Sequence, residues 1–317
     1  GAKISKLQKS DNKILHSVSF LPCNFDKYIN KSSYDVINLH WVQGEMISIE
    51  AIGRIRKPLI WTFHDTWPFC GSEHYPKDLN DRRYIKGYKK NNKPKGHNYF
   101  DFDRWCWERK KKHWKNNIHV VCPSNWLANC TSQSKLMKNW DISVIPNTLD
   151  INTFKQWPKD ISRKLFNLPL NKKIILFGAI GGTKSFIKGW DLLSEVLNLV
   201  YSKNKDCIAV IFGQSESSLP KNLNIPVHFI GQLFDKESLS MLYSSADVMV
   251  VPSRLEAFGQ TASEASSCGT PVIAFNNSGL KDIISHNQTG FLVDPYDTNQ
   301  MSKFILSLLR NDNLVSN

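Results

Sequence analysis

Short apolar runs alternate with amphipathic stretches along most of the chain, and this alternation predicts how the chain folds. In the first half the apolar runs fall at 36–40, 59–63, 118–122 and 144–145, with helix-length stretches near 47–56 and from 126 onward. Short apolar runs with polar ends are typical of buried parallel strands. The pattern breaks near 148–168, where Trp157-Pro158 and Leu168-Pro169 stand, so we place a linker there.

The second half repeats the same alternation. Its apolar runs fall at 173–177, 208–212, 227–230, 248–251 and 272–275, and its helical stretches at 190–201, 236–245 and 298–309. Strand–helix alternation on both sides of a linker predicts two doubly wound α/β domains with parallel, Rossmann-like sheets, at 1–150 and 151–317. We expect the site in a cleft between them, at the carboxyl ends of the strands.

Composition narrows the class of protein. Hydrophobic residues make up 41% of 317, which is typical of a globular chain. No run of 18 or more apolar residues is present, so no membrane-spanning helix is predicted. The seven cysteines are scattered, without a C-x-x-C pair, which favours reduced cytosolic thiols. The first predicted strand begins only at 36, and we expect residues to be missing at one or both ends.

The net charge of +13 is concentrated in one segment, 82–117, which we expect to be an insertion in the first domain. It holds 13 basic and 3 acidic side chains. Basic charge with aromatic side chains suits an anionic membrane surface, and we expect Lys110, Lys111 and Lys112 to contribute to it. A solvated insertion and a nucleic-acid face, where bases stack on aromatics, are the alternatives. The aromatic residues are Tyr84, Tyr88, Tyr99, Phe100, Phe102, Trp105, Trp107 and Trp114.

The most specific chemistry lies at 253–275. Glu256 and Glu264 stand eight positions apart, and between them a turn through Gly259 leads into a short predicted helix. A helix start offers free backbone N–H groups to a phosphate, and a carboxylate can accept two hydroxyl donors. Because glycine lacks a Cβ atom, Gly259 allows a ligand to approach the backbone. This segment therefore predicts a sugar-nucleotide site.

Several motifs together resemble one known family. They are L-E-A-F-G at 255–259, V-I-P-N-T-L-D at 144–150, F-G-A at 177–179 followed by Lys188-Gly189, G-F-L-V at 290–293 and W-T-F-H-D-T-W-P-F at 61–69. With these motifs the chain resembles, over roughly 35–310, the retaining glycosyltransferases of the two-domain GT-B type, family 4 (group 1). The last motif resembles a subgroup that builds bacterial surface polysaccharides of the O-antigen and colanic-acid type.

The resemblance implies roles for residues of the second domain. Lys188, with Lys184, would neutralise the diphosphate, and Glu264 would accept the ribose hydroxyls. Glu256 would contact the donor sugar or support the positive charge that develops on it. Backbone N–H groups for sugar and phosphate would come from Phe258, Gly259 and Gln260. The nucleotide base would lie along Gly231, Gln232 and Leu233.

Three further side chains are candidates. His64 ends the second predicted strand, and the resemblance implies that it contacts the donor sugar or the reacting centre. Asp65 would orient His64 or bind the acceptor. Arg254 would reach phosphate or form an ion pair with a neighbour. Only Cys70 and Cys106 stand near the W-P-F motif, so no metal is predicted.

The implied activity is the transfer of a hexose from a nucleoside diphosphate sugar (UDP or GDP) to a lipid-linked, undecaprenyl-type saccharide, with retention of configuration and without a cofactor. The enzyme would act in lipopolysaccharide or other polysaccharide biosynthesis, peripherally on the cytoplasmic face of the membrane. The first domain would bind acceptor and the second donor. A sugar-nucleotide epimerase on the same fold, and a non-catalytic sugar or nucleic-acid binding module, are the alternatives.

Overall fold

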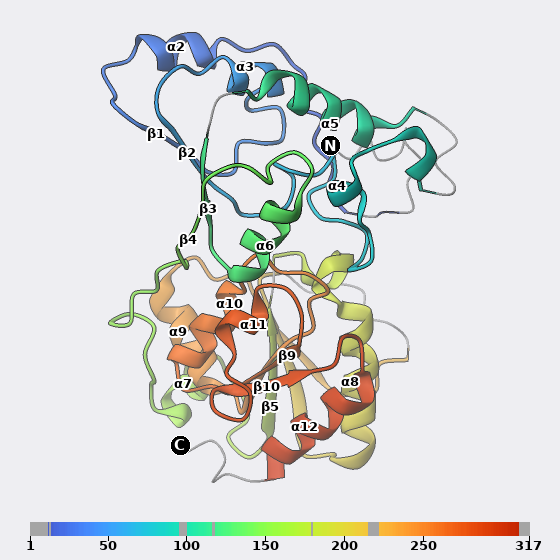
Figure 1. The fold of residues 1–317 in the computed structure, drawn as a ribbon. Coiled ribbons are helices and arrows are strands. Elements are labelled where there is room, and N and C mark those ends of the chain that lie inside the picture. Colours follow the sequence, from blue (N-terminus) through green and yellow to red (C-terminus); the bar gives the residue numbers. More distant parts are fainter. Residues whose placement is uncertain are drawn as a thin grey trace. The chain divides into compact units, whose positions relative to one another are not determined.

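A computed structural model describes residues 12, 14–94, 100–115, 118–178, 180–214 and 222–310. The chain divides into two compact units, 1–146 and 147–317, and each is an α/β unit (Figure 1). Two residues named above, Tyr99 of the basic segment and Ala179 of the F-G-A motif, lie outside the described residues.

The first unit is built on four parallel strands that follow one another in sequence order. They are β1 (Ile37–Leu39), β2 (Leu59–Thr62), β3 (His119–Cys122) and β4 (Ile142–Val144). Trp61 in β2 is 0% exposed, at the centre of the core. The helices of this unit are α2 (Phe25–Lys31), which precedes β1, and α3 (Ile49–Gly53), α4 (Arg83–Lys86), α5 (Phe102–His113) and α6 (Asn125–Gln133), with a 3-10 turn, η1 (Lys90–Asn92).

The second unit has six parallel strands in the order β10-β9-β8-β5-β6-β7. They are β5 (Lys173–Gly178), β6 (Cys207–Phe212), β7 (Val227–Gly231), β8 (Val248–Val251), β9 (Val272–Phe275) and β10 (Gly290–Val293). The helices are α7 (Lys159–Leu165), α8 (Trp190–Lys203), α9 (Lys236–Ser245), α10 (Gln260–Ser267), α11 (Leu280–Ile283) and α12 (Thr298–Arg310), with 3-10 turns η2 (Gly182–Lys184) and η3 (Phe186–Lys188).

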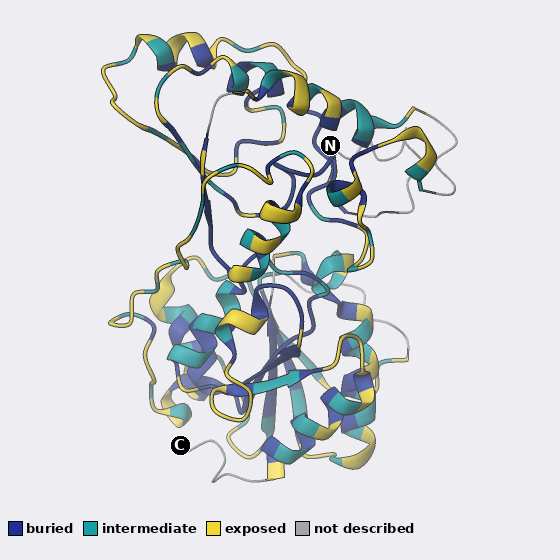
Figure 2. Ribbon diagram, viewed as in Figure 1, coloured by how far each residue is buried: buried dark blue, intermediate teal, exposed yellow. Residues whose placement is uncertain are grey.

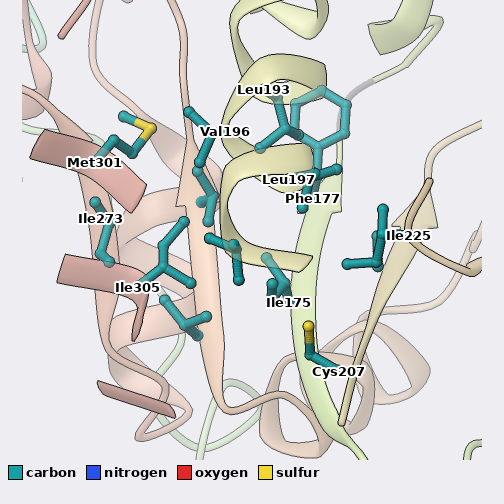
Figure 3. Close-up of a cluster of buried hydrophobic side chains, with 14 of the residues drawn as sticks. Ile175, Phe177, Leu193, Val196, Leu197, Cys207, Ile225, Ile273, Met301 and Ile305 are labelled. Carbon is teal, nitrogen blue, oxygen red and sulfur yellow. The ribbon is translucent and has the colours of Figure 1, made fainter. Parts of the chain in front are cut away.

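Side chains of the second sheet alternate between two apolar layers, as the period of a strand requires. Ile175 and Phe177 of β5 join a layer with α8 and α12 (Figure 3). Ile174 and Leu176 of the same strand join the opposite layer, with α9 and α10. Because both faces are covered, the inner strands β5, β6, β8 and β9 are buried along nearly their whole length, while the edge strands β7 and β10 are less buried (Figure 2). This burial explains the continuous apolar runs of the inner strands.

The strand order reverses at the middle of this sheet. The chain proceeds from β5 outward to β6 and β7, and then returns to place β8, β9 and β10 on the other side of β5. In doubly wound sheets such a switch point opens a crevice at the carboxyl ends of the two strands, where ligands bind. Here those strands are β5 and β8.

The predicted strands and the helices at 190–201, 236–245 and 298–309 are confirmed within a few residues, and so are the two parallel sheets. The strand expected at 144–145 begins earlier, at Ile142, because its pairing with β3 starts there. Inside the predicted linker lies α7, whose Arg163 bonds to Asp247 next to β8. A second helix, α5, was not predicted, because charged residues obscure its buried face.

Candidate functional site

The switch point brings together the two side chains that follow its strands. Lys188 comes after β5 and Glu256 after β8, and the Lys188 Nζ lies 2.6 Å from Glu256 Oε1. The two side chains are 32% and 14% exposed, so the pair is accessible from solvent. A cation and a carboxylate at the carboxyl edge of a parallel sheet can bind a diphosphate and a hydroxylated ligand side by side.

Neighbouring segments hold Glu256 in place. The Ser253 hydroxyl donates to Glu256 Oε1 at 2.8 Å, and the backbone N–H of Glu256 donates to Ser278 Oγ at 3.0 Å. Its carbonyl accepts from the N–H of Gly279 at 2.9 Å. A Cβ atom on Gly279 would lie 2.6 Å from the carbonyl oxygen of Ala257, so this contact requires glycine.

Two helices begin beside this pair. α8 starts directly after Gly189, whose φ of +70° is left-handed and whose Cβ, if it had one, would lie 2.0 Å from the carbonyl oxygen of Pro252. α10 starts after Gly259, which has a φ of +112°. Phe258 precedes that glycine and Gln260 opens the helix. The free N–H groups of both first turns suit a phosphate, and Lys184 is exposed in the loop before α8.

Arg254 adopts the second of the two roles predicted for it. Its guanidinium pairs with both oxygens of Asp191 in α8, at 2.8 and 2.6 Å, and lies 3.9 Å from the centroid of the Phe186 ring. Its backbone N–H also donates to the carbonyl of Ile187 at 2.7 Å. The residue thereby ties the loop that carries Lys188 to the loop that carries Glu256.

Glu264 lies one turn into α10 and is 9% exposed. The phenol O–H of Tyr243 in α9 donates to its Oε2 at 2.8 Å. Burial raises the pKa of Glu264, and the hydrogen bonds from Tyr243 and Gln260 oppose that rise. The Gln260 side-chain oxygen in turn accepts from Asn147 at 3.4 Å, so the V-I-P-N motif extends to this helix.

The predicted base-binding residues lie at the carboxyl end of β7, with Gly231 as its last residue. Gly231 has a φ of +84° and its carbonyl accepts from the N–H of Gly213. Gln232 is exposed, and Leu233 packs partly against the layer formed with α9 and α10. Like the Lys188–Glu256 pair, these residues lie at the carboxyl ends of the strands. They are not next to that pair, because β7 is the outermost strand and lies two positions from β5.

In the first unit, two imidazoles meet at the carboxyl ends of neighbouring strands. His40 follows β1 and His64 follows β2, and His40 Nδ1 lies 2.9 Å from His64 Nε2 with the rings stacked. Burial and then His40 lower the pKa of His64, so its ring is neutral at pH 7. His64 can therefore accept or donate a hydrogen bond to a ligand without carrying charge.

Of the two roles predicted for Asp65, orienting His64 is not supported by the contacts of its carboxylate. Asp65 is 5% exposed and its carboxylate holds His74 instead, with Oδ2 lying 2.6 Å from the His74 Nδ1. The same oxygen accepts from the indole N–H of Trp41 at 3.0 Å, and Ser17 Oγ lies 2.8 Å from His74 Nε2. These buried hydrogen bonds hold Trp41 in place. Trp41 is the next residue after His40 and remains 46% exposed.

The basic segment is folded more deeply than its composition indicates. Tyr84, Tyr88, Trp107 and Trp114 are at most 7% exposed, and Lys110 is 0% exposed. The prediction that Lys110 belongs to an outward basic triplet is therefore wrong, because the regular turn of α5 carries it to the core side. Lys111 and Lys112, one and two positions on, are exposed.

A smaller aromatic cluster does lie near the surface of this segment. It consists of Phe20, Phe100, Phe102 and Trp105, with ring centroids 5.0 to 6.3 Å apart. Phe20 is 48% and Phe100 58% exposed. We call these four residues the aromatic cluster.

A pocket of about 360 Å³ lies elsewhere in the first unit. It is lined by the buried Glu73 and Asp103 together with Arg82 and Arg83. Burial and the neighbouring Asp103 raise the pKa of Glu73 well above its ordinary value. The described residues that line this pocket come mainly from 77–94, not from the strand ends that carry His40 and His64.

Sequence reasoning missed several residues of these two clusters. His40 ends a predicted strand and Trp41 follows it, and a position at a strand end was also the signal that singled out His64. Asn147 lies between the predicted strand at 144–145 and the predicted linker at 148–168. Tyr243 and His74 carry no local signal, because each meets its carboxylate through tertiary packing.

The residues that the structure describes offer neither a cluster of metal ligands nor a membrane-spanning helix. No group of three or more His, Cys, Asp or Glu side chains is arranged to hold a metal ion in this part of the chain. None of the helices described above is long and apolar enough to cross a membrane.

Comparison with known families accounts for nearly the whole chain. A family described as "Glycosyl transferases group 1" matches residues 158–317, and "Glycosyltransferase Family 4" matches residues 5–153. The first match spans the Lys188–Glu256 pair and Glu264, and the second spans the His40–His64 pair.

Curated relatives are similar over about half of the chain. A D-inositol 3-phosphate glycosyltransferase of Xylanimonas cellulosilytica is 30% identical over 186 residues, which cover 54% of this chain and 43% of the relative. An uncharacterized glycosyltransferase of Haemophilus influenzae is 32% identical over 191 residues, 57% of this chain and 49% of the relative. The chain thus spans less than half the length of these curated relatives.

Solved structures share the fold at low identity. Sucrose-phosphate synthase from Thermosynechococcus elongatus superposes with a TM-score of 0.65 at 23% identity, covering 92% of this chain and 68% of that one. Anabaena HepE, solved with UDP and glucose, gives 0.62 at 18% identity, covering 93% and 74%. The glycosyltransferase WaaG gives 0.60 at 16% identity, covering 80% and 70%. The predicted GT-B fold class is confirmed.

Proposed function

This chain belongs to the group 1 glycosyl transferases, and we propose that it moves a hexose from a nucleoside diphosphate sugar to a lipid-linked saccharide. The observation that carries the donor half is the Lys188–Glu256 pair at the switch point, with Glu264 one turn into α10. In this proposal Lys188 neutralises the diphosphate and Glu264 accepts the ribose hydroxyls. HepE, a structural neighbour, was solved with UDP, which supports this donor class.

The chemistry then follows from charge. As the bond between the anomeric carbon and the phosphate oxygen breaks, negative charge grows on the diphosphate and positive charge on the sugar. Lys188 and the first turns of α8 and α10 stabilise the former, and Glu256 stabilises the latter. The acceptor oxygen bonds to the same face of the carbon and its proton passes to the leaving phosphate, so configuration is retained.

A titration tests the donor half. UDP, GDP and their sugars are titrated into the parent protein and into Lys188→Met. We expect the variant to lose at least tenfold in affinity, the order of a charged contact to phosphate. Lys172→Met is the matched control, because Lys172 also pairs with a carboxylate, Asp206 at 3.0 Å, but precedes β5 at the opposite edge of the sheet. Equal affinities in all three proteins would contradict the assignment.

A substitution of Glu256 distinguishes an enzyme from a non-catalytic binding module. We expect Glu256→Ala to bind nucleoside diphosphate but to hydrolyse the donor sugar at least a hundredfold more slowly, since an electrostatic stabiliser of the transition state is lost. Product analysis with and without acceptor distinguishes transfer from epimerisation. Hydrolysis at the parent rate in Glu256→Ala would remove Glu256 from the mechanism.

The acceptor would bind to the first unit, at the His40–His64 pair and Trp41. Exposed rings with imidazole hydrogen-bonding groups suit the apolar face and hydroxyls of a sugar. Several relatives are named as D-inositol 3-phosphate glycosyltransferases, so inositol 3-phosphate is the second candidate acceptor. We expect transfer to an undecaprenyl-linked saccharide and not to inositol 3-phosphate, with product configuration read by NMR. Transfer to inositol 3-phosphate and not to the undecaprenyl-linked saccharide would make inositol 3-phosphate the acceptor.

Peripheral attachment to a cytoplasmic membrane face completes the proposal. The aromatic cluster supplies interfacial rings, and Lys111 and Lys112 supply exposed charge on α5. We expect binding to liposomes with anionic lipid, weakening with salt, and a several-fold loss in the double variant Lys111→Glu, Lys112→Glu. The double variant Lys203→Glu, Lys205→Glu makes the same charge change on exposed residues of the second unit, at the end of α8. Similar losses in both double variants would indicate nonspecific attraction only.

A further inference from the structure

Tyr243 in α9 supplies a fixed hydrogen-bond donor to Glu264. The phenol oxygen lies 2.8 Å from Glu264 Oε2, and Tyr243 is 0% exposed. Its ring contacts those of Phe154 and Phe212, with centroids 6.5 and 5.6 Å away. Because the ring is packed on these neighbours, the hydroxyl points in one direction whether or not a ligand is bound.

Glu264 retains capacity for further hydrogen bonds. An ionised carboxylate has about four lone-pair sites; Tyr243 uses one, and the Gln260 side chain supplies a second bond. Taking a carboxylate out of water is unfavourable unless its remaining sites also find donors. Two vicinal hydroxyls, as on a ribose, would supply them in the bidentate geometry that a carboxylate accepts.

We propose that Tyr243 is a positioning residue for the ribose of the nucleotide: it fixes the Glu264 carboxylate so that the remaining acceptor sites face the two vicinal hydroxyls. This inference rests on the proposed function, in which Glu264 accepts those hydroxyls. Tyr243 itself touches neither sugar nor diphosphate in this arrangement, and no sequence motif points to it.

The same hydrogen bond affects the charge of Glu264. Burial raises the pKa of Glu264, and the bonds from Tyr243 and Gln260 and the charge of Lys236 lower it. The groups that face this carboxylate are thus Tyr243 and Lys236 of α9 and, at the end of α10, Cys268. Without the phenol donor the pKa of Glu264 rises further. Ribose binding should then fail at a higher pH, because a protonated carboxyl accepts fewer bonds.

The substitution Tyr243→Phe removes one oxygen atom and keeps the packed ring. UDP and GDP are titrated into the parent, and the tighter of them is compared with its 2′,3′-dideoxy analogue on both proteins. We expect the variant to lose about tenfold in affinity for the ribonucleotide, the order of one hydrogen bond to a charged group, and nothing for the dideoxy analogue. Between pH 8 and pH 5, the ribonucleotide affinity of the variant should fall at a higher pH than that of the parent.

Two further variants make the outcomes decisive. Tyr201→Phe, in α8 of the same unit, should change neither affinity. In a Glu264→Ala background, Tyr243→Phe should have no further effect on ribonucleotide affinity, because the acceptor of the Tyr243 hydroxyl is gone. Equal losses for both nucleotides, an unshifted pH profile or additive effects would each overturn the inference. A parent protein that binds neither UDP nor GDP would instead refute the proposed function.

Discussion

Replacing Lys110 by methionine should destabilise the first unit, by an amount that depends on pH. Lys110 is 0% exposed, and its ammonium donates to the backbone carbonyls of Trp67, Cys70 and Gly71, the last two at 3.1 and 2.7 Å. It also lies 3.6 Å from the centroid of the Trp67 ring. The lysine therefore holds together the turn at 67–71, which follows β2 and the residues His64 and Asp65.

The size of the effect follows from the groups left behind. Methionine has nearly the length of lysine but no donor, so three buried carbonyl groups would lose their partner. Each such loss costs about 1–3 kcal/mol, partly offset because methionine needs no desolvation of charge. We therefore expect the free energy of unfolding to fall by about 2–4 kcal/mol at pH 7.

The pH dependence identifies the cause. Burial lowers the pKa of Lys110 from 10.5 to about 8. Between these values the unfolded chain binds more protons than the folded one, so the contribution of Lys110 to the free energy of unfolding rises with pH. Each pH unit within that window corresponds to about 1.4 kcal/mol. Between pH 7 and pH 9 the parent should therefore gain about 1.4 kcal/mol relative to Lys110→Met.

Urea unfolding at pH 7, 8 and 9 measures both quantities. Burial also raises the pKa of the Cys70 and Cys106 thiols, which lowers stability as pH rises, but both proteins contain them. Lys112→Met is the matched control, since Lys112 is exposed on the same helix. A stability difference between parent and Lys110→Met that stays constant from pH 7 to pH 9, or a Lys110→Met as stable as Lys112→Met, would refute a buried lysine with a lowered pKa.

Three further predictions concern the two candidate sites. Gly189→Ala should lower the free energy of unfolding by about 2–3 kcal/mol in urea titrations and weaken nucleotide binding. The cause is that the new Cβ would meet the Pro252 carbonyl, and unchanged values would contradict that contact. Trp41→Ala should raise the acceptor KM roughly five- to tenfold without changing the Kd for nucleoside diphosphate, whereas a changed nucleotide Kd would argue against an acceptor role. Asp65→Asn should lower the free energy of unfolding by about 2 kcal/mol, because the buried acceptor for His74 is weakened. Calorimetry measures this loss, and an unchanged free energy would refute the role of the buried hydrogen bonds between Trp41, Asp65, His74 and Ser17.

The second unit was largely predictable because its chemistry follows its strands. Strands buried on both faces give continuous apolar runs, and the carboxyl ends of parallel strands share one edge. Glu256 and Lys188 each follow such a run, so their meeting required no knowledge of distant contacts beyond the strand order. The ion pair of 2.6 Å between them is what adjacent strands in this topology produce.

The first unit was less predictable because tertiary contacts decide which charged side chains are buried. The charges of α5 obscure the helical period, and nothing local distinguishes the buried Lys110 from the exposed Lys112. Asp65 precedes His74 by nine residues of irregular chain, so their 2.6 Å contact has no periodic signal. Sequence pattern reports burial only where the apolar residues themselves are regular.

This contrast indicates where further functional residues should be sought. The candidate ligand-binding side chains Glu256 and His64 each follow a strand, so the pattern of apolar runs points to them. A residue that fixes such a side chain lies in the core, and its polar atom is what distinguishes it from its neighbours. Tyr243 and His74 are of this second kind, since each is nearly fully buried and each bonds to a carboxylate. Because burying such a bond is favourable only when the geometry is kept, losing the bond at His74 should cost stability. Tyr243→Phe, which keeps the packed ring, should instead affect ribose binding before it affects the fold.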